Sequence, residues 1–490
     1  MINTEVRIHD KFSFEFKIGF ITDNKLKDIN EFRINTWFFI PNSLNINRIT
    51  YPKERFYNDV RTNIRLITPR YTLDEILKEG RGPFARLDHA VDKIINGEVV
   101  DNSDERTESY LYQIKMLMCV CKSAMREETT HILASQKDKD IASRIDGFVG
   151  KLRAISARYR TIEQRLLKHS ASAEQMNYFA FGDEFLGNII EQHCFTLLRR
   201  LKRKAMSEEI RATIYALLSE ENSYKKQNGF GIVEEGEDER NSFVISRRGV
   251  LKKFVESDLF LQTERKEDGV LMRQFLYSIA AGLAMIFATV ISFFATKRFG
   301  NLTADLFVVL VISYMLKDRI KELARYFFTS RLSRKYFDNK WNLSLRKQRI
   351  GWIKEGMDFV LGNRVPDEVL ALRGRNPLME AENEIYDESI ICYRKLVNLS
   401  REDLEKYKEY RLDGINDITR INLNHFILRM DDPSIPLYMP DEESGYTQIQ
   451  GKRMYTLYFM IYCESEQNRY YRKYRLLFNR EGISDVSELD

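Results

Sequence analysis

Cysteine, histidine and proline are all scarce in this chain of 490 residues. The cysteines are odd in number and lack the spacing of a disulfide framework, which favours a reducing compartment; they are Cys119, Cys121, Cys194, Cys392 and Cys463. Cys119 and Cys121 are separated by one residue, whereas redox and zinc pairs are separated by two. The six histidines include no His-x-x-x-His pair, so we expect neither a metal site nor a cofactor.

Sequence motifs of catalysis are also missing. There is no phosphate-binding Gly-x-x-x-x-Gly-Lys-Ser/Thr loop, no Gly-x-Ser-x-Gly, no His-Glu-x-x-His and no kinase-type His-Arg-Asp. The carboxylate pairs Asp387-Glu388 and Asp431-Asp432 have no lysine or histidine at a spacing that suits acid–base catalysis. We therefore expect no catalytic residues from sequence motifs.

The first residues, Met1–Asp10, do not have the pattern of a cleavable signal peptide.

One long apolar run stands out in a chain whose composition is otherwise that of a soluble protein. The segment Phe275–Ala295 carries no charge, and its twenty-one residues would form a helix of about 31 Å, the thickness of a bilayer's hydrocarbon core. A second, weaker run spans Phe299–Leu316, where Asp305 interrupts the apolar sequence and Leu306–Leu316 is uncharged. These two runs predict a two-helix transmembrane hairpin over residues 273–316.

Basic residues near the two runs predict the orientation of that hairpin. The turn between the runs has only Lys297 and Arg298, whereas more basic residues lie on both flanks. Those after the second run are Lys317, Arg319, Lys321, Arg325, Arg331, Arg334 and Lys335. Both flanks, and both termini, are therefore expected in the cytoplasm, with the chain in an inner (plasma) membrane.

The basic stretch 317–349 is expected to form a juxtamembrane helix. It holds eleven basic residues against three acidic ones, with aromatic residues between them. Such a helix would lie against anionic lipid headgroups, each nearby basic residue contributing about 1 kcal/mol. Nucleic acid is the alternative partner, but the position beside an apolar run favours lipid.

Small side chains recur every fourth residue along the first run and form a stripe down one helix face. The stripe consists of Ala280, Ala284, Ala288, Ser292 and Thr296. Small residues allow close helix packing in lipid, either with the second helix of the same hairpin or with a neighbouring protomer.

The N-terminal part, residues 1–100, is predicted to be rich in β-structure. Apolar residues alternate with polar ones from Val6 to Phe20, with one break at Asp10 that indicates a bulge or bend. A second strand is expected over Phe32–Ile40, and Thr72 is expected to begin a capped helix.

Residues 103–222 are predicted to form a bundle of long helices with a coiled-coil-like seam. Apolar residues with alternating spacings of four and three make up this seam: Ile141, Ile145, Phe148, Leu152, Ile155, Tyr159, Ile162 and Leu166. The seam could pack within the bundle or pair between chains. His193 and Cys194 are read as helix-face residues of this bundle and not as a catalytic pair.

The remaining parts are a linker with a pre-membrane helix, residues 223–272, and a mixed α/β part, residues 350–490. A strand is expected over Ser389–Leu399, and a β-hairpin over Met454–Cys463 and Arg469–Asn479. The first hairpin strand is apolar on both faces, which predicts a central position. We expect these strands to join those of the N-terminal part in one composite sheet.

The predicted fold class is therefore an α+β membrane protein with a two-helix transmembrane hairpin between cytoplasmic portions. The expected function is that of a non-enzymatic oligomeric scaffold, sensor or defence component, with anionic lipid, further copies of the chain and an unidentified protein as partners. Two alternatives are a membrane-disrupting effector and a membrane-tethered enzyme acting on nucleic acid or lipid.

Overall fold

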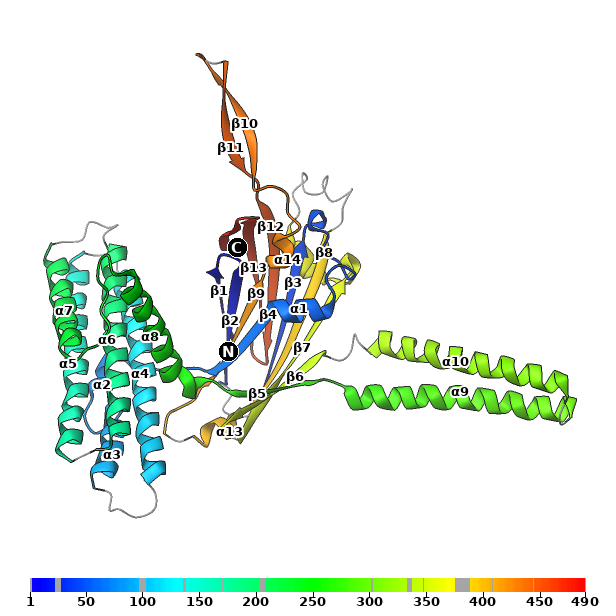
Figure 1. Ribbon diagram of the computed structural model, residues 1–490, viewed down its shortest axis with the longest axis horizontal. Helices are drawn as coiled ribbons and strands as arrows, with labels where there is room; N and C mark the ends of the chain where they lie inside the picture. The colour runs from blue at the N-terminus through cyan, green and yellow to red at the C-terminus, as the bar shows by residue number, and fades with distance from the viewer. Residues whose placement is uncertain are drawn as a thin grey trace. The chain divides into compact units, whose positions relative to one another are not determined.

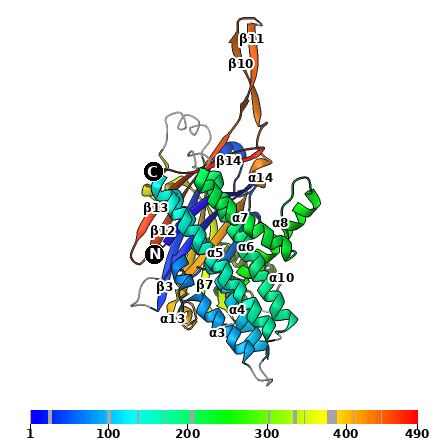
Figure 2. The same ribbon diagram turned by 90° about the vertical axis from the view of Figure 1, so that its left-hand side faces the viewer.

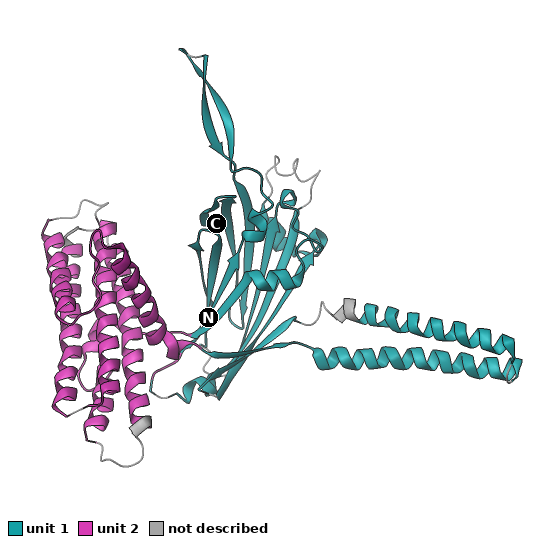
Figure 3. Cartoon of the chain, in the orientation of Figure 1, with its two compact units in different colours: residues 1–65, 261–409, 413–490 teal, residues 66–260, 410–412 magenta. Residues whose placement is uncertain are grey.

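The chain contains two compact units, which are coloured separately in Figure 3. Unit 1 comprises residues 1–65, 261–409 and 413–490, and unit 2 comprises residues 66–260 and 410–412. The structure is a computed structural model that describes residues 2–22, 28–96, 103–134, 138–169, 171–201, 208–300, 303–332, 337–346, 348–374, 388–407, 409–443 and 445–489.

The core of unit 1 is an eight-stranded antiparallel sheet with the order β14-β13-β12-β3-β8-β7-β6-β5. Its strands come from distant parts of the chain: β3 (Ile29–Ile40), β5 (Gln262–Glu267), β6 (Asn339–Leu345), β7 (Gln348–Val360), β8 (Ser389–Ser400), β12 (Tyr455–Ser465), β13 (Arg469–Asn479) and β14 (Gly482–Leu489). β3 pairs with β8 on one side and with β12 on the other. The predicted composite sheet is thus confirmed, as is the central position of β12.

A four-stranded sheet packs against one face of this large sheet. Its order is β1-β2-β9-β4, formed by β1 (Ile2–Asp10), β2 (Ser13–Ile21), β9 (Gly414–Asn422) and β4 (Val60–Leu66). The ring of Phe14 in β2 lies 5.5 Å from that of Phe459 in β12, which lies 5.6 Å from Phe38 in β3. Alternate residues of β3 face the other way, because Trp37 and Phe39 pack against Val369 of the short helix α11 (Asp367–Arg373).

The break in alternation at Asp10 is the turn of a hairpin and not a bend within one strand. β1 and β2 pair antiparallel, with a register irregularity between Ile8 and Asp10. The Asp10 side chain accepts a hydrogen bond of 2.8 Å from the Phe12 amide and so stabilises the turn. Short elements complete unit 1: η1 (Asn42–Leu44), α1 (Lys53–Asp59), η4 (Gly362–Arg364), α13 (Arg401–Glu405) and α14 (Asn424–Ile427).

Unit 2 is helical, as Figures 1 and 2 show. Its helices are α2 (Leu73–Leu77), α3 (Pro83–Ile95), α4 (Ser103–Ala134), α5 (Asp138–Lys168), α6 (Ala173–Leu201), α7 (Glu208–Gln227) and α8 (Asp238–Glu256), followed by η3 (Ser257–Leu259). The expected capped start at Thr72 is confirmed. The Thr72 side chain accepts a hydrogen bond from the Glu75 amide, and the Glu75 carboxylate accepts one from the Thr72 amide.

Two further long helices, α9 (Val270–Phe299) and α10 (Ala304–Leu332), follow β5 and precede β6. The basic stretch predicted as a separate helix over 317–349 therefore belongs to three elements. Residues 317–332 continue α10 without a break, and β6 and the beginning of β7 follow.

The predicted two-helix transmembrane hairpin is wrong. Among the described residues, only α9 is long and apolar enough to cross a membrane. The uncharged run of α10, Leu306–Leu316, has eleven residues and a length of about 16 Å, roughly half of a bilayer's hydrocarbon thickness. Asp305 precedes this run, and Lys317 and Asp318 follow it. The chain is a mixed α/β protein with one candidate spanning helix in its described part.

Candidate functional site

The most unusual surface of unit 1 lies on the pair of helices α9 and α10, which we call the arm (Figure 1). The two helices run side by side in opposite directions, because the Arg325 guanidinium of α10 lies 5.2 Å from the Tyr277 ring near the beginning of α9. The arm begins directly after β5 and returns to β6, and these two strands are hydrogen-bonded neighbours.

The stripe of small residues lies partly on the side of α9 that α10 covers. Ala280 and Ala284 are fully buried, Ala288 and Ser292 are half-buried, and Thr296 is exposed. Ser313 of α10 is also buried. The first half of the stripe is therefore packed within the arm of a single chain, where small side chains let the helices approach closely.

The rest of α9 is apolar and exposed. In its most apolar window of eighteen residues only 17% of residues are buried. Phe293 is 71% exposed and Met285 is 59% exposed, and on α10 Phe307 is 69% exposed. Monomeric soluble proteins rarely expose contiguous apolar patches of this kind, and such patches mark contact with a partner or with lipid.

The basic residues predicted to lie at a membrane surface occupy the second half of α10. Lys317 lies 3.8 Å from the Tyr314 ring, and Arg325 pairs with Glu322 at 3.3 Å. Lys321 is half-buried and Arg319 is exposed. The side chain of Arg331 and the whole of Arg334 and Lys335 lie outside the described residues.

In unit 2, the predicted helical seam lies on the buried face of α5. All eight seam residues are buried: Ile141, Ile145, Phe148, Leu152, Ile155, Tyr159, Ile162 and Leu166. The stacked rings of Tyr159 and Phe179 are 4.8 Å apart and join α5 to α6. Because the other helices of unit 2 cover the seam, it contributes to the core of that unit and not to an exposed surface.

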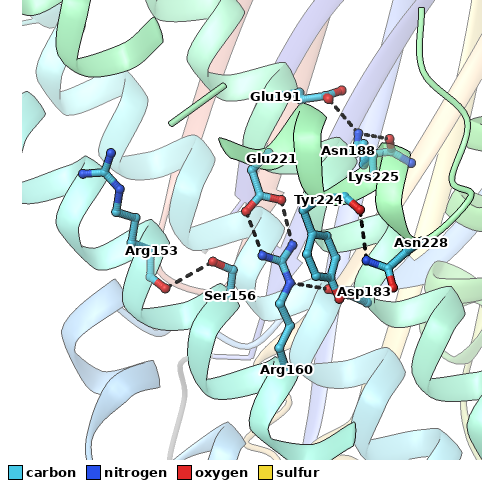
Figure 4. Close-up of polar contacts among 10 residues, drawn as sticks. All are labelled: Arg153, Ser156, Arg160, Asp183, Asn188, Glu191, Glu221, Tyr224, Lys225 and Asn228. Carbon is cyan, nitrogen blue, oxygen red and sulfur yellow. Dashed lines mark hydrogen bonds and ion pairs between the residues drawn. The ribbon is translucent and has the colours of Figure 1, made fainter. Parts of the chain in front are cut away.

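A network of buried charges joins α5, α6 and α7 (Figure 4). Arg160 of α5 makes a bidentate ion pair with Glu221 of α7, at 3.1 and 2.8 Å, and a bond of 3.2 Å to Asp183 of α6. The Arg160 guanidinium also lies 3.4 Å from the Tyr224 ring, and the Tyr224 hydroxyl donates to Asp183 at 2.6 Å. Every charge here is paired, so the network fixes the relative positions of the helices.

The network extends to α8 through Glu191. The Lys225 ammonium lies 2.8 Å from Glu191 and donates to Asn188 at 2.8 Å, while Arg248 of α8 also pairs with Glu191 at 2.8 Å. Burial lowers the pKa of Lys225, and the neighbouring Glu191 carboxylate partly opposes this shift. On the same side of α8, Arg247 makes an ion pair with Glu184 at 2.8 Å.

A cationic cleft of about 530 Å³ lies between α4, α6 and α8. Its charged lining residues are one acid, Glu191, and four bases, Lys122, Arg199, Arg248 and Lys252. Lys122 pairs with Glu256 at 2.5 Å. The cleft also contains Phe195, whose side chain is 57% exposed. This arrangement suits an anionic group on a partner, held by arginine and lysine.

His193 of α6 is buried and hydrogen-bonded. Its Nδ1 lies 3.3 Å from the Thr129 hydroxyl of α4. Burial, with the positive charges of Arg126 and Lys122, lowers the pKa of His193 to about 4. Cys194 is buried beside it, and burial raises the pKa of its thiol to about 12. At neutral pH a neutral histidine and a protonated thiol do not form a nucleophilic pair.

In unit 1, the polar group that most resembles catalytic machinery is His425 with Asp59 and Tyr51. Asp59 Oδ2 accepts from the Tyr51 hydroxyl at 2.7 Å and lies 2.8 Å from His425 Nδ1. The structure records no serine, threonine or cysteine bonded to this group within its described residues. Among all the residues that the structure describes, no three side chains of histidine, cysteine, aspartate or glutamate are placed to hold a metal ion.

Sequence reasoning missed the strand β5, the cationic cleft and the buried charge network. β5 has the sequence QTERKE and is exposed throughout, so it lacks the alternation that identifies a strand. The cleft combines residues from three helices that are far apart in sequence. The basic run Arg199–Lys204, with five basic residues in six, was the local signal for part of it.

Comparisons of the chain with protein-family models, with curated proteins and with solved structures find no significant match. The arm and the cationic cleft are therefore interpreted from their own geometry.

Proposed function

We propose that this protein is a non-enzymatic scaffold or sensor that attaches to the cytoplasmic face of a membrane through its arm and associates with further copies of itself. In this proposal α9 contacts lipid, the sheets of unit 1 carry the arm, and the helices of unit 2 receive a protein partner.

The exposure of α9 is the observation that carries the proposal. A helix of this length and composition also occurs in the core of soluble proteins and in signal sequences. A core helix is mostly buried, whereas only 17% of the most apolar window of α9 is buried. A signal sequence lies near the N-terminus, whereas α9 begins at Val270. Lipid is the environment that best matches such a helix.

The pairing of β5 with β6 supports attachment of the arm to the membrane from one side only. Glu267 and Asn339 are partners in the sheet, and α9 and α10 connect these two strands. Both ends of the arm are thus tied to the same sheet. A single crossing by α9 would place β6 on the far side of the membrane and break this pairing.

The charges of α10 support attachment to anionic lipid. Lys317, Arg319, Lys321 and Arg325 outnumber Asp318 and Glu322 in the second half of the helix. Each basic residue near an anionic surface contributes about 1 kcal/mol, and this attraction weakens as salt is added. The same charges beside an exposed apolar helix favour lipid over nucleic acid as the partner.

The cationic cleft supports a role for unit 2 in binding an acidic partner. Four basic residues and one carboxylate line the cleft, and two of the four, Lys122 and Arg248, pair with Glu256 and Glu191. Phe195 offers an exposed apolar surface within the same cleft. The combination of an exposed aromatic residue with arginines is typical of protein interfaces.

The proposal predicts that carboxylates on the exposed side of α9 abolish binding to vesicles. The change is Met285→Glu with Phe293→Glu, and the matched control is Tyr215→Glu on α7, where Tyr215 is 68% exposed. An acidic residue in the hydrocarbon costs roughly 2.5–3.5 kcal/mol, so we expect binding to fall at least fifty-fold.

The measurement is flotation of the full-length protein, reconstituted by detergent removal, with vesicles of zwitterionic lipid or of zwitterionic lipid mixed with anionic lipid. The wild type and Tyr215→Glu should float, more completely with the anionic mixture. Equal flotation of the arm variant and the wild type would refute attachment by α9, as would a wild type that floats with neither vesicle.

A further inference from the structure

A separate two-stranded sheet projects from the rest of unit 1 (Figure 1), and all of its residues except Asp441 and Gly451 are exposed. It consists of β10 (Ser434–Asp441) and β11 (Gly445–Lys452). Exposed apolar residues of this ribbon include Leu437, Tyr438 and Ile449. A two-stranded ribbon on its own is marginally stable in water, and three or more strands are needed for independent stability. This ribbon therefore has the properties of a sheet that is completed by another strand.

The hydrogen-bonding phase of the ribbon shows which edge is open. The Arg453 amide donates to the Pro433 carbonyl at 2.8 Å, so these two residues form a hydrogen-bonded pair. The next pairs are Ser434 with Lys452 and Ile435 with Gly451, and the register continues without a shift to the turn. In antiparallel strands hydrogen-bonded and non-hydrogen-bonded pairs alternate. The pairs of Pro436 with Gln450 and of Pro440 with Tyr446 are therefore non-hydrogen-bonded, which agrees with the missing N–H of proline.

The two outer edges of the ribbon differ as a result. On β10 the outward-facing residues are Ser434, Pro436, Tyr438 and Pro440, and only Ser434 and Tyr438 have an N–H to donate. Proline is a common means of blocking an edge strand. On β11 the outward-facing residues are Tyr446, Gln448, Gln450 and Lys452, and each has both an N–H and a carbonyl. Only the β11 edge can accept a further strand over its full length.

We infer that the β11 edge pairs with the β11 edge of a second copy of this chain, in antiparallel orientation about a two-fold axis at Gln448. Gln448 then lies opposite its own counterpart, and Tyr446 lies opposite Gln450 of the other copy. The result is a four-stranded sheet with the order β10-β11-β11-β10. Both of its outer edges are proline-containing β10 strands, so assembly stops at two copies.

Charge complementarity argues for a second copy in this orientation. The turn of the ribbon is acidic, with Asp441, Glu442 and Glu443. The end of β11 at its base is basic, with Lys452 and with Arg453, which also pairs with Asp431 of its own chain. An antiparallel pair centred on Gln448 places the acidic turn of each copy beside the basic base of the other. Opposite charges at facing positions stabilise strand pairing, and the contact occurs twice in a two-fold dimer.

This inference specifies how the chain associates with itself, and it rests on the proposed function. The variants that test it alter the ribbon and leave the arm intact, so they should bind vesicles as the wild type does. The variant Gln448→Pro removes the central donor of the open edge, and the matched control Tyr438→Pro removes one outward N–H from the blocked edge. Mass photometry of the full-length protein should show dimers for the wild type and for Tyr438→Pro. Gln448→Pro should raise the dissociation constant at least tenfold.

Exchanging two surface charges tests dimer formation with substitutions that do not disturb the backbone of the ribbon. Glu442→Lys should weaken the dimer, and the double variant Glu442→Lys with Lys452→Glu should restore it. Glu442 and Lys452 of the other copy are diagonal neighbours on one face in this register, so the double variant reverses their contact in both copies. Failure of the second change to restore association would overturn the inference. A wild type that is monomeric, or a Gln448→Pro variant that dimerises like the wild type, would also overturn it.

Cysteine cross-linking gives an independent readout, because all five native cysteines are buried. Oxidation of Gln448→Cys should yield a covalent dimer across the two-fold axis. Tyr438→Cys, on the blocked edge, should remain monomeric under the same conditions. Equal cross-linking of the two variants would contradict pairing through β11.

Discussion

His193 is a buried titratable side chain that is held neutral by its surroundings. Its pKa is about 4, because burial and the charges of Arg126 and Lys122 all disfavour the protonated ring. An unfolded histidine has a pKa of about 6.5. Between these two values the unfolded chain binds a proton that the native chain does not. The free energy of unfolding therefore falls by about 1.4 kcal/mol per pH unit as the pH drops from about 6.5 to about 4.

We predict that His193→Gln flattens this pH dependence. The glutamine amide still offers a partner to the Thr129 hydroxyl, and it does not titrate. Between pH 6.5 and 4, the decrease in the free energy of unfolding should therefore be roughly 3 kcal/mol smaller in the variant than in the wild type. Urea unfolding followed by circular dichroism measures the difference, and His169→Gln is the control because His169 is exposed. An equal pH slope in wild type and His193→Gln would show that His193 titrates normally.

Residue-level reasoning from sequence was most successful where a residue acts on its own neighbours. The helix start at Thr72 is a local hydrogen-bonding pattern, and the Thr72 side chain caps its helix as expected. The partners of Glu191 and Arg160 were beyond such reasoning, because each ion pair joins residues of different helices that are more than twenty positions apart in the sequence. Long-range pairing leaves no periodic signal in the sequence.

At the scale of elements, α5 and α6 approach each other closely at Gly182. A Cβ atom at this position would overlap with the Tyr159 hydroxyl and would lie 2.9 Å from Ile114 Cγ2. The Tyr159 hydroxyl cannot easily move, since it donates to the Phe179 carbonyl at 3.1 Å. By contrast, a Cβ atom at Gly150 of α5 would meet nothing within 4 Å.

Two glycine-to-alanine changes should therefore have opposite effects. Gly182→Ala should destabilise unit 2 by about 1–3 kcal/mol through overpacking. Gly150→Ala should stabilise it by about 0.5–1 kcal/mol, since alanine favours the helix and nothing obstructs its side chain. Urea unfolding of both variants gives the comparison. A stabilising Gly182→Ala would show that α5 and α6 pack less closely than described.

Elements with strong periodicity were predicted well, and weakly patterned ones were not. The seam of α5, the strand β8 and the hairpin β12–β13 all have clear apolar patterns, and the structure places helix or strand at each of them. The second transmembrane helix was predicted over Phe299–Leu316. That prediction failed, because the uncharged part after Asp305, Leu306–Leu316, is too short to span a bilayer. The pre-membrane helix expected within residues 223–272 is α8, Asp238–Glu256, and it is followed by η3 and β5.

At the scale of the whole molecule, the large sheet of unit 1 depends on both ends of the chain. β3 lies between β8 and β12, which follow it by several hundred residues. The sequence predicted these strands and their meeting, since a strand that is apolar on both faces needs neighbours on both sides. It did not predict that the helices of unit 2 and the arm are insertions between strands of one sheet. Insertion sites are set by strand pairing, which composition does not reveal.

The most direct test of the account removes the arm and leaves the sheet intact. The Asp268 amide donates to the Asp338 carbonyl at 3.2 Å, beside the paired residues Glu267 and Asn339. Residues 269–337 can therefore be replaced by Asn-Gly, which forms a two-residue turn between antiparallel strands. The measurement is the fraction of this armless protein that sediments with cell membranes, together with its thermal unfolding. We predict an unchanged unfolding transition and a protein that remains in the soluble fraction. A folded armless protein that still sediments with membranes would contradict this prediction.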